Sequence, residues 1–560
     1  MTSETDLGRR DLLAWEKSQP QDAYAADPNL DRVLALRFGQ DRLAGERERL
    51  HGAGRLAAGR LRQLCADTNH DQNLPRLERY DGLGVRREEV VFHPSYHEAG
   101  RLVWSTGVLS DYATPGREVV QMALLYLFAQ VGEYGHQCPL ACTAGLIKLI
   151  QRVGSDDQKQ RYLPRLLHRD YAQRLHASQF LTEVQGGSDV GSNAMVAVRE
   201  GDHFRLHGEK WFCSVIDAGA FLMTARPEGA PAGTKGLGLF VVPRELEGET
   251  NQFFVRRLKR KLGTRAMASG EADFLGAYAE PLGELERGFK NVVEIVLNTS
   301  RIYNAVCCAG GMQAAYQLAR TFAAHRRAFG QTIDQYPLVQ EKLAILRAEA
   351  LGAVASTFRL TAQADRFATQ EPSGDELLAW RVGVNVNKYF TAVRNTDSVR
   401  MAVEVFGGNG TIETFSPLVQ LYRDSMVLES WEGTHNVLVQ QVLRDAARYG
   451  AHLAFLRELR EGLARAQLPA AHAELRERTR RGLDALAAGF ERLGGGDGDQ
   501  RFGRVLVDQA AALLECTALL EELAATPEDT VKAAAIGLLL ERYVAEQLAP
   551  PPAIPAALLS

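Results

Sequence analysis

The sequence predicts an α+β protein in which helical segments flank a β region. Residues 1–172 carry apolar residues at helical spacing, for example in 140–153. Residues 173–285 instead hold short apolar runs separated by Gly, Pro and charge clusters, a pattern typical of strands. Long helical segments return in 286–445, and an Ala-, Leu- and Arg-rich helical tail fills 446–560. We take these four ranges as the expected domains.

The first region contains one breaker-rich turn and one pair of histidines. Gly132-Glu-Tyr-Gly-His-Gln-Cys-Pro139 separates two apolar helical stretches. His93-Pro-Ser-Tyr-His97 has two imidazoles four residues apart, which could share a helix face. No third ligand lies nearby, and Pro94 suits the first turn of a helix. We therefore expect structural histidines here and no metal site.

The second region is expected to be a compact antiparallel β domain that ends near Leu282. Gly, Pro and charged residues flank each of its apolar runs, as they flank the strands of such domains. The clearest runs are Phe204–Leu206, Phe221–Ala225, Leu237–Val242 and Phe253–Val255.

Three long helices are expected in the third region, over 290–326, 338–367 and 376–405. Gly407 and Gly408 follow the last of them, where a helix end favours residues that tolerate positive φ. In the tail, apolar stripes at helical spacing predict packed helices, a glycine-rich linker is expected at Gly494–Gly498, and Pro550–Pro552 marks a stop. The stripe residues are Leu456, Leu459, Leu463, Leu506, Ala510, Leu513, Leu520 and Leu523.

Composition excludes several classes of protein. The 560 residues are 46% hydrophobic and 24% charged, with a formal net charge of −4, so there is no global basic footprint for nucleic acid or anionic membrane. No apolar run approaches the ~20 residues that a membrane span needs. The N-terminus lacks the apolar stretch of a secretion signal, and the seven scattered cysteines favour reduced thiols. We expect a cytoplasmic location.

Four segments carry the chemistry when they are taken together. They are Leu181-Thr-Glu-Val-Gln-Gly-Gly-Ser-Asp-Val190, Gly208-Glu-Lys-Trp-Phe-Cys-Ser214, Arg326-Arg-Ala-Phe-Gly330, and Val405-Phe-Gly-Gly-Asn-Gly410 with the downstream Trp431-Glu-Gly-Thr434. Their order and spacing resemble the acyl-CoA dehydrogenase family over about 80–445. The chain is most similar to the AidB-like branch, which also has an extra helical tail. The resemblance implies an N-terminal helical domain, a central antiparallel β-barrel or sandwich, and a C-terminal four-helix bundle.

The resemblance implies a base for removing the α-proton of an acyl-CoA thioester. Such a proton is weakly acidic, so the reaction needs a carboxylate base and hydrogen-bond donors to the thioester oxygen. Glu432 matches the family's base, and Gly433 matches a substrate contact beside it. The position used by other members is Ser300, which cannot act as a carboxylate base. Arg301 matches an arginine near the active site, although a helix-surface salt bridge would explain it equally well.

The implied cofactor is non-covalent FAD, which accepts the β-hydrogen as hydride. Leu181 and Thr182 match residues at the isoalloxazine, and Ser188 matches a contact to both cofactor and substrate. Phe212 replaces a common tryptophan but can still stack on the ring, and Ser214 keeps a hydroxyl near flavin N5. Further matches to FAD contacts are Arg326 from a neighbouring subunit, with Phe329, Gly407, Gly408, Thr434 and Asn436.

Two departures from the family pattern affect the site. Glu404 stands where most members carry glutamine near the FAD diphosphate, and a carboxylate there repels phosphate unless it is paired or protonated. Val184-Gln185 replaces the usual Pro-Gly pair at the substrate entrance. The implied partners are an electron-transferring flavoprotein and three further copies in a homotetramer.

Two other functions stay open. One is an AidB-like flavoprotein of the alkylation-damage response that binds DNA through its tail. Residues 451–560, however, hold 12 Lys plus Arg against 16 Asp plus Glu, and a DNA-binding surface is enriched in positive charge. The tail's arginines at 476–481 alternate with glutamates, which indicates an ion-paired helix face. The other is a monooxygenase on the same fold, which would need no base such as Glu432.

Overall fold

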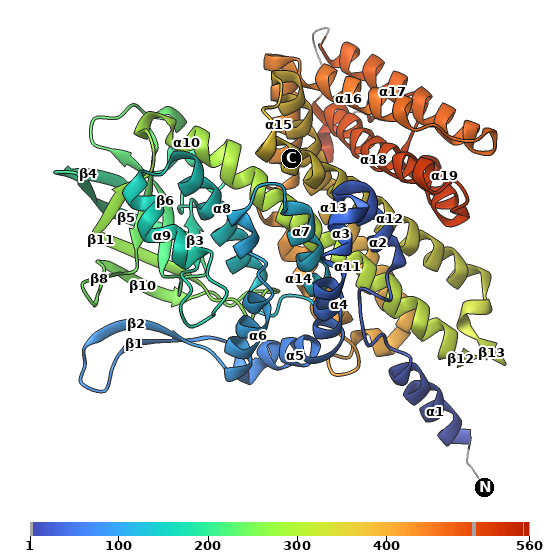
Figure 1. Ribbon diagram of the computed structural model, residues 1–560, viewed down its shortest axis with the longest axis horizontal. Helices are drawn as coiled ribbons and strands as arrows, with labels where there is room; N and C mark the ends of the chain where they lie inside the picture. The colour runs from blue at the N-terminus through green and yellow to red at the C-terminus, as the bar shows by residue number, and fades with distance from the viewer. Residues whose placement is uncertain (1–3, 495–499, 553, 559–560) are drawn as a thin grey trace.

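A computed structural model describes residues 4–494, 500–552 and 554–558. The β domain lies at one side of the molecule, the helical regions fill the middle, and the tail helices pack on the far side (Figure 1). The predicted α+β class is confirmed. Apart from Gly494, the predicted linker lies outside the described residues.

The N-terminal region is mostly helical, as expected, but it also contains a β-hairpin that the sequence did not predict. Strands β1 (Arg76–Tyr80) and β2 (Arg86–Val91) pair antiparallel and extend below the β domain (Figure 1). Their side chains are mainly charged and exposed, so they give no clear apolar alternation. The helices are α1 (Glu4–Lys17), α2 (Pro28–Phe38), α3 (Gln40–Ala44), α4 (Arg47–Leu56), α5 (Arg62–Asn69), α6 (Pro94–Ser105), α7 (Glu118–Ala129), α8 (Gln137–Val153) and α9 (Asp156–Leu166).

The β domain closes on itself as a small barrel. Strands pair in the order β11–β5–β4–β6–β7 and return to β11, with β10 and β3 on the outside of this ring. The expected antiparallel arrangement is wrong at two pairings, because β6 runs parallel to both β3 and β4. Two chain reversals separate β4 from β6, so the two strands point the same way. The strands are β3 (Ala177–Phe180), β4 (Val196–Glu200), β5 (His203–Ser214), β6 (Ala220–Pro227), β7 (Gly238–Pro243), β10 (Phe253–Leu258) and β11 (Ser269–Pro281), with β8 (Glu245–Leu246) and β9 (Glu249–Thr250) as a separate short pair.

The third region is a bundle around three long antiparallel helices, α11 (Asn298–His325), α12 (Pro337–Thr369) and α13 (Gly374–Phe406). Two shorter helices, α14 (Leu418–Ser430) and α15 (His435–Tyr449), pack along α13. The short hairpin of β12 (Arg327–Ala328) and β13 (Gln331–Thr332) projects at the end of the bundle away from the β domain (Figure 1). Gly407 ends α13 with φ +61°, as the helix-end pattern predicted.

The tail forms α16 (Ala451–Arg465), α17 (Ala473–Gly494), α18 (Gln500–Ala525) and α19 (Thr530–Tyr543), and α18 and α19 pack on α12. Every predicted stripe residue of the tail is buried. The apolar core therefore runs without a break from the N-terminal helices through the bundle into the tail. A second core fills the β barrel, and Trp431 packs against both.

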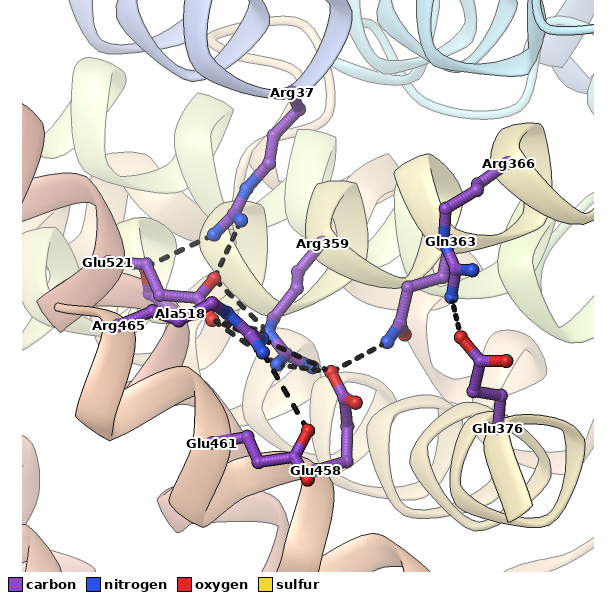
Figure 2. Close-up of polar contacts among 10 residues, drawn as sticks. All are labelled: Arg37, Arg359, Gln363, Arg366, Glu376, Glu458, Glu461, Arg465, Ala518 and Glu521. Carbon is purple, nitrogen blue, oxygen red and sulfur yellow. Dashed lines mark hydrogen bonds and ion pairs between the residues drawn. The ribbon is translucent and has the colours of Figure 1, made fainter. Parts of the chain in front are cut away.

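A charged contact, which we call the tail joint, fastens the tail to the rest of the chain (Figure 2). Glu521 of α18 accepts hydrogen bonds from Arg37 of α2 at 2.6 Å and from Arg359 of α12 at 3.2 Å. Arg359 also donates to Glu458 of α16 at 2.8 Å. The side chain of Arg359 is only 5% exposed, so these carboxylates neutralise a buried cation.

Candidate functional site

Glu432 lies where the bundle meets the β barrel, directly after Trp431, which contacts both cores. Its backbone has φ +58°, and the next residue, Gly433, has φ +109°. Positive φ is costly for a residue with a side chain and concentrates at functional sites. The chain therefore holds the backbone of Glu432 in a conformation that a free loop would avoid.

Two buried cations fix this turn. Arg301 of α11 donates from Nε to the carbonyl oxygen of Glu432 at 3.0 Å, and its other arm donates to Asn385 of α13 at 2.5 Å. Lys388 of α13 donates from Nζ to the carbonyl oxygens of Glu429 and Gly433, each at 3.0 Å. Arg301 thus does not form a helix-surface salt bridge, and it acts on the turn through the backbone.

Removal from water shifts the ionisation of the two buried cations and of the half-buried Glu432. Desolvation raises the pKa of Glu432, and Arg301 and Lys388 partly oppose that shift by stabilising the carboxylate. Desolvation also lowers the pKa of Arg301 to about 10 and that of Lys388 to about 8. Glu432 is therefore a stronger base than a solvated glutamate while it remains ionisable.

A buried ion pair pins the loop that carries Leu181 and Thr182. Lys210 of β5 donates to Glu183 at 2.7 Å, and both side chains are almost completely buried. The other oxygen of Glu183 accepts from the amides of Ala194 and Met195. The amide of Trp211 also donates to the Thr182 carbonyl at 2.9 Å. This network fixes the path of the loop and leaves Leu181 and Thr182 half-buried at the barrel surface.

The end of β5 presents an aromatic surface beside a pair of hydroxyls. Phe212 is 50% exposed, and Lys259 lies over the rings of Trp211 and Phe212. Ser214 Oγ lies 3.1 Å from Ser269 Oγ, which in turn accepts from Lys261 Nζ at 3.0 Å. An exposed aromatic face with adjacent hydroxyls is suited to a flat ring that also accepts hydrogen bonds.

The remaining predicted residues fall into two sets. The first set is exposed and lies near Glu432 in the sequence or on the barrel loop. Thr434 and Asn436 follow Glu432 within four residues, and Ser188 lies on the loop after β3. Arg504 of the tail helix α18 donates to the side-chain oxygen of Asn436, so the tail reaches this edge of the site.

The second set lies at the opposite end of the bundle. Arg326 follows the last residue of α11, whereas Arg301 lies in its first turn, and 25 helical residues span about 37 Å. Phe329 on the projecting hairpin is 98% exposed. Gly407 and Gly408 are exposed nearby, where Phe322 stacks on Phe406. A single copy of the chain therefore does not bring this set, Arg326, Phe329, Gly407 and Gly408, to Glu432.

The glutamate that departs from the family pattern has a partner. Glu404 forms an ion pair with Lys342 of α12 at 2.8 Å, and hydrogen bonding to Lys342 lowers its pKa. The carboxylate is thus neutralised in place, which removes the objection that it would repel a phosphate.

Comparison with known proteins identifies the family. Residues 15–173 match "Adaptive response protein AidB N-terminal domain", 178–276 match "Acyl-CoA dehydrogenase, middle domain", and 286–447 match "Acyl-CoA dehydrogenase, C-terminal domain". The chain is 34% identical over 421 residues to the putative acyl-CoA dehydrogenase AidB of Escherichia coli K12, covering 72% of this chain and 73% of that protein. It is 32% identical over 441 residues to acyl-CoA dehydrogenase family member 11 of Caenorhabditis elegans, covering 75% of this chain and 70% of that protein.

The chain belongs to the acyl-CoA dehydrogenase family. The crystal structure of C. elegans ACDH-11 in complex with C11-CoA aligns with a TM-score of 0.87 at 28% identity, over 95% of this chain and 93% of that one. The predicted family, its AidB-like branch and the fold are confirmed. An acyl-CoA dehydrogenase is an oxidoreductase that acts on a CH–CH bond of acyl-CoA, and FAD is its cofactor. None of the described helices is long and apolar enough to cross a membrane.

Two residues of this acyl-CoA dehydrogenase site escaped the sequence analysis. Lys388 and Asn385 lie on α13 among buried neighbours, and they hold Glu432 and Arg301 in place. A lysine and an asparagine among the valines and aromatic residues of 382–390 were the available signal, because such groups are buried only when they are paired. The carbonyls that Lys388 binds lie 41 and 45 residues further along the sequence, so the sequence did not reveal them as its partners.

Proposed function

We propose that this protein catalyses FAD-dependent α,β-dehydrogenation of an acyl-CoA thioester, with Glu432 as the base that removes the α-proton. The observation that carries the proposal is the strained, desolvated Glu432 at the junction of bundle and barrel. A carboxyl with a raised pKa in such a place is suited to general base catalysis.

The chain offers a suitable surface for FAD. Phe212, Ser214 and Thr182 present an aromatic face and hydroxyls at the barrel edge. When bound there, FAD supplies the acceptor for the hydride that leaves the β-carbon. The separation of Arg326 from Glu432 supports a second copy as the source of Arg326, as in the homotetramer that we propose. A guanidinium is suited to binding a diphosphate from a neighbouring chain.

The turn can also bind the thioester oxygen. The amide N–H of Glu432 makes no hydrogen bond with any residue of the described part of the chain. It is therefore free to donate to the oxygen on which negative charge develops as the α-proton leaves. Arg301 and Lys388 bind the carbonyl oxygens of Glu432 and Gly433 and so hold the turn in this shape. We propose that the substrate is an acyl-CoA, the class bound by the C. elegans relative, and that the electrons pass to an electron-transferring flavoprotein.

Replacing Glu432 tests this proposal. We expect Glu432→Gln to retain bound FAD and to slow anaerobic bleaching of the flavin by a reactive acyl-CoA at least about 100-fold, because the isosteric amide cannot accept the proton. The measurement is visible absorbance across a panel of acyl chain lengths.

The matched control is Glu294→Gln, which removes a carboxyl on the segment leading into α11. It should bleach at the normal rate. If Glu432→Gln also bleaches at the normal rate, Glu432 is not the base. If the unmodified protein takes up no FAD, the proposed reaction itself is wrong.

A further inference from the structure

A groove of about 920 Å³ opens between the N-terminal hairpin and the barrel, and most of its cations take no part in the proposed reaction. Its walls are the segment that leads into β1, strand β10 and the loop that follows β10. We call it the basic groove. Nine of its lining residues are cationic and one, Asp71, is acidic; the cations are Arg76, Arg79, Arg256, Arg257, Lys259, Arg260, Lys261, Arg265 and Arg423.

Carboxylates neutralise five of the nine cations. Arg256 pairs with Glu209 and Asp273, and Arg257 and Lys259 share Glu271. The other two neutralised cations follow the same pattern, with Arg265 paired to Asp71 and Arg423 to Glu413.

Four cations have no carboxylate partner among the described residues. Arg79 donates to the backbone carbonyls of Val255 and Arg256, and Lys261 donates to the Met267 carbonyl and to Ser269. Arg76 and Arg260 are exposed, and their side chains make no hydrogen bond or ion pair within the described part of the chain. In a protein of net charge −4, this local excess creates a positive potential that a bound anion would relieve.

The groove is also partly apolar. Leu77, Leu258 and Met267 line it, and Leu262 beside them is 59% exposed. A surface of this kind is suited to a ligand that carries negative groups at one end and a flat, weakly polar group at the other. Guanidinium groups bind phosphates in a bidentate manner and stack on aromatic rings, and the volume is that of a small-molecule site.

We infer that the basic groove binds a nucleotide carrying two or more phosphates, with the phosphates on Arg76, Arg79 and Arg260 and the base over Leu258 and Leu262. The groove adjoins the candidate flavin surface, because Lys261 and Ser269 line it and Ser269 contacts Ser214. Lys259, Lys261 and Ser269 border both sites, but the arginines that we assign to the phosphates are not among the residues proposed for FAD, and the inference does not depend on Glu432 being a base.

Calorimetry on the FAD-saturated protein tests the inference, with ATP, inorganic tripolyphosphate and adenosine as probes. We expect ATP to bind, tripolyphosphate to bind more weakly, adenosine to give no heat, and FAD to stay bound. The double variant Arg76→Gln/Arg260→Gln should weaken ATP binding about tenfold or more, since it removes two charge-assisted contacts. Both side chains are exposed and unpaired, so the variant should fold normally.

The matched control is Arg9→Gln/Arg476→Gln, which removes two exposed arginines whose side chains, like those of Arg76 and Arg260, have no hydrogen bond or ion pair within the described residues. It should bind ATP within about twofold of the unmodified protein, because surface charges far from the site are screened. The inference is overturned if ATP binds both variants equally, or if ATP displaces FAD and so competes for the cofactor site. It is also overturned if a 24-base-pair duplex binds while ATP does not, because the groove would then be part of a nucleic-acid surface. Protein that takes up no FAD would refute the proposed function, while ATP binding to it could still be measured.

Discussion

Two cavities of similar size, one at the tail joint and one in the basic groove, differ in how their charges are paired. The cavity at the tail joint encloses about 770 Å³ and is lined by five cations and five acids, and each cation has an acidic partner. Figure 2 shows these pairs except that of Arg457 with Asp375. The groove encloses about 920 Å³ and leaves four of its nine cations without an acidic partner among the described residues. Matched charges link two parts of the chain, whereas the unmatched charges of the groove leave a positive potential that a bound anion would relieve.

The largest effect is expected from breaking the joint. Glu521→Ala leaves Arg37 without a carboxylate and the buried Arg359 with Glu458 alone. Removing one partner from a buried charge network strands the other charge, so we expect the free energy of unfolding to fall by about 3 kcal/mol. Chemical denaturation measures it, and limited proteolysis should cleave first between α16 and α17.

The control for this variant is Glu461→Gln. Glu461 is exposed, and its one ion pair among the described residues is with Arg465 at 3.8 Å, so its loss should change the free energy of unfolding by less than about 0.5 kcal/mol. Equal effects for the two variants would mean that the joint does not fasten the tail.

Acid should loosen the same joint. Burial opposes ionisation of Glu521, but Arg359 and Arg37 outweigh it and hold the pKa of Glu521 below its ordinary value. A lowered pKa gives stability that is present above the unfolded-state pKa, near 4.5, and is lost as the pH falls through the lower folded-state value. We therefore expect the joint to contribute fully at neutral pH and to lose its contribution below about pH 4.5.

Denaturation curves between pH 7 and pH 3 provide the measurement. Glu521→Gln should lose less stability over this range than the unmodified protein, because the amide has no charge to lose. Parallel pH profiles for the two proteins would contradict the assignment.

The difference between the paired charges at the tail joint and the unpaired charges of the basic groove could not be predicted from the sequence. Helical apolar periodicity located the bundle and the tail stripes, because each stripe is local in sequence and is buried as a unit. The motif around Glu432 was found through its resemblance to a family, while Lys388 was not, because its partners lie more than 40 residues away in the sequence.

The basic groove combines residues near 76 with residues near 260, which are far apart in the sequence. Its hairpin strands are locally mixed in charge, and the net charge of −4 hides the excess. The predicted ion-paired face of the tail is confirmed at Arg480 and Arg481, which find their acids within one or two turns, but not at Arg476 and Arg478, which have no ion pair within the described residues.

The smallest effect on stability is expected from the groove. Arg76→Gln/Arg260→Gln removes two exposed cations that have no partner within the described residues. Because it removes repulsion among like charges and breaks no contact, the free energy of unfolding should stay within about 0.5 kcal/mol of the original value, with any change toward greater stability. Chemical denaturation at low and high salt provides the measurement, and added salt should shrink any gain. A loss as large as that of Glu521→Ala would show that these arginines support the fold, and the difference between the two cavities would then have no functional meaning.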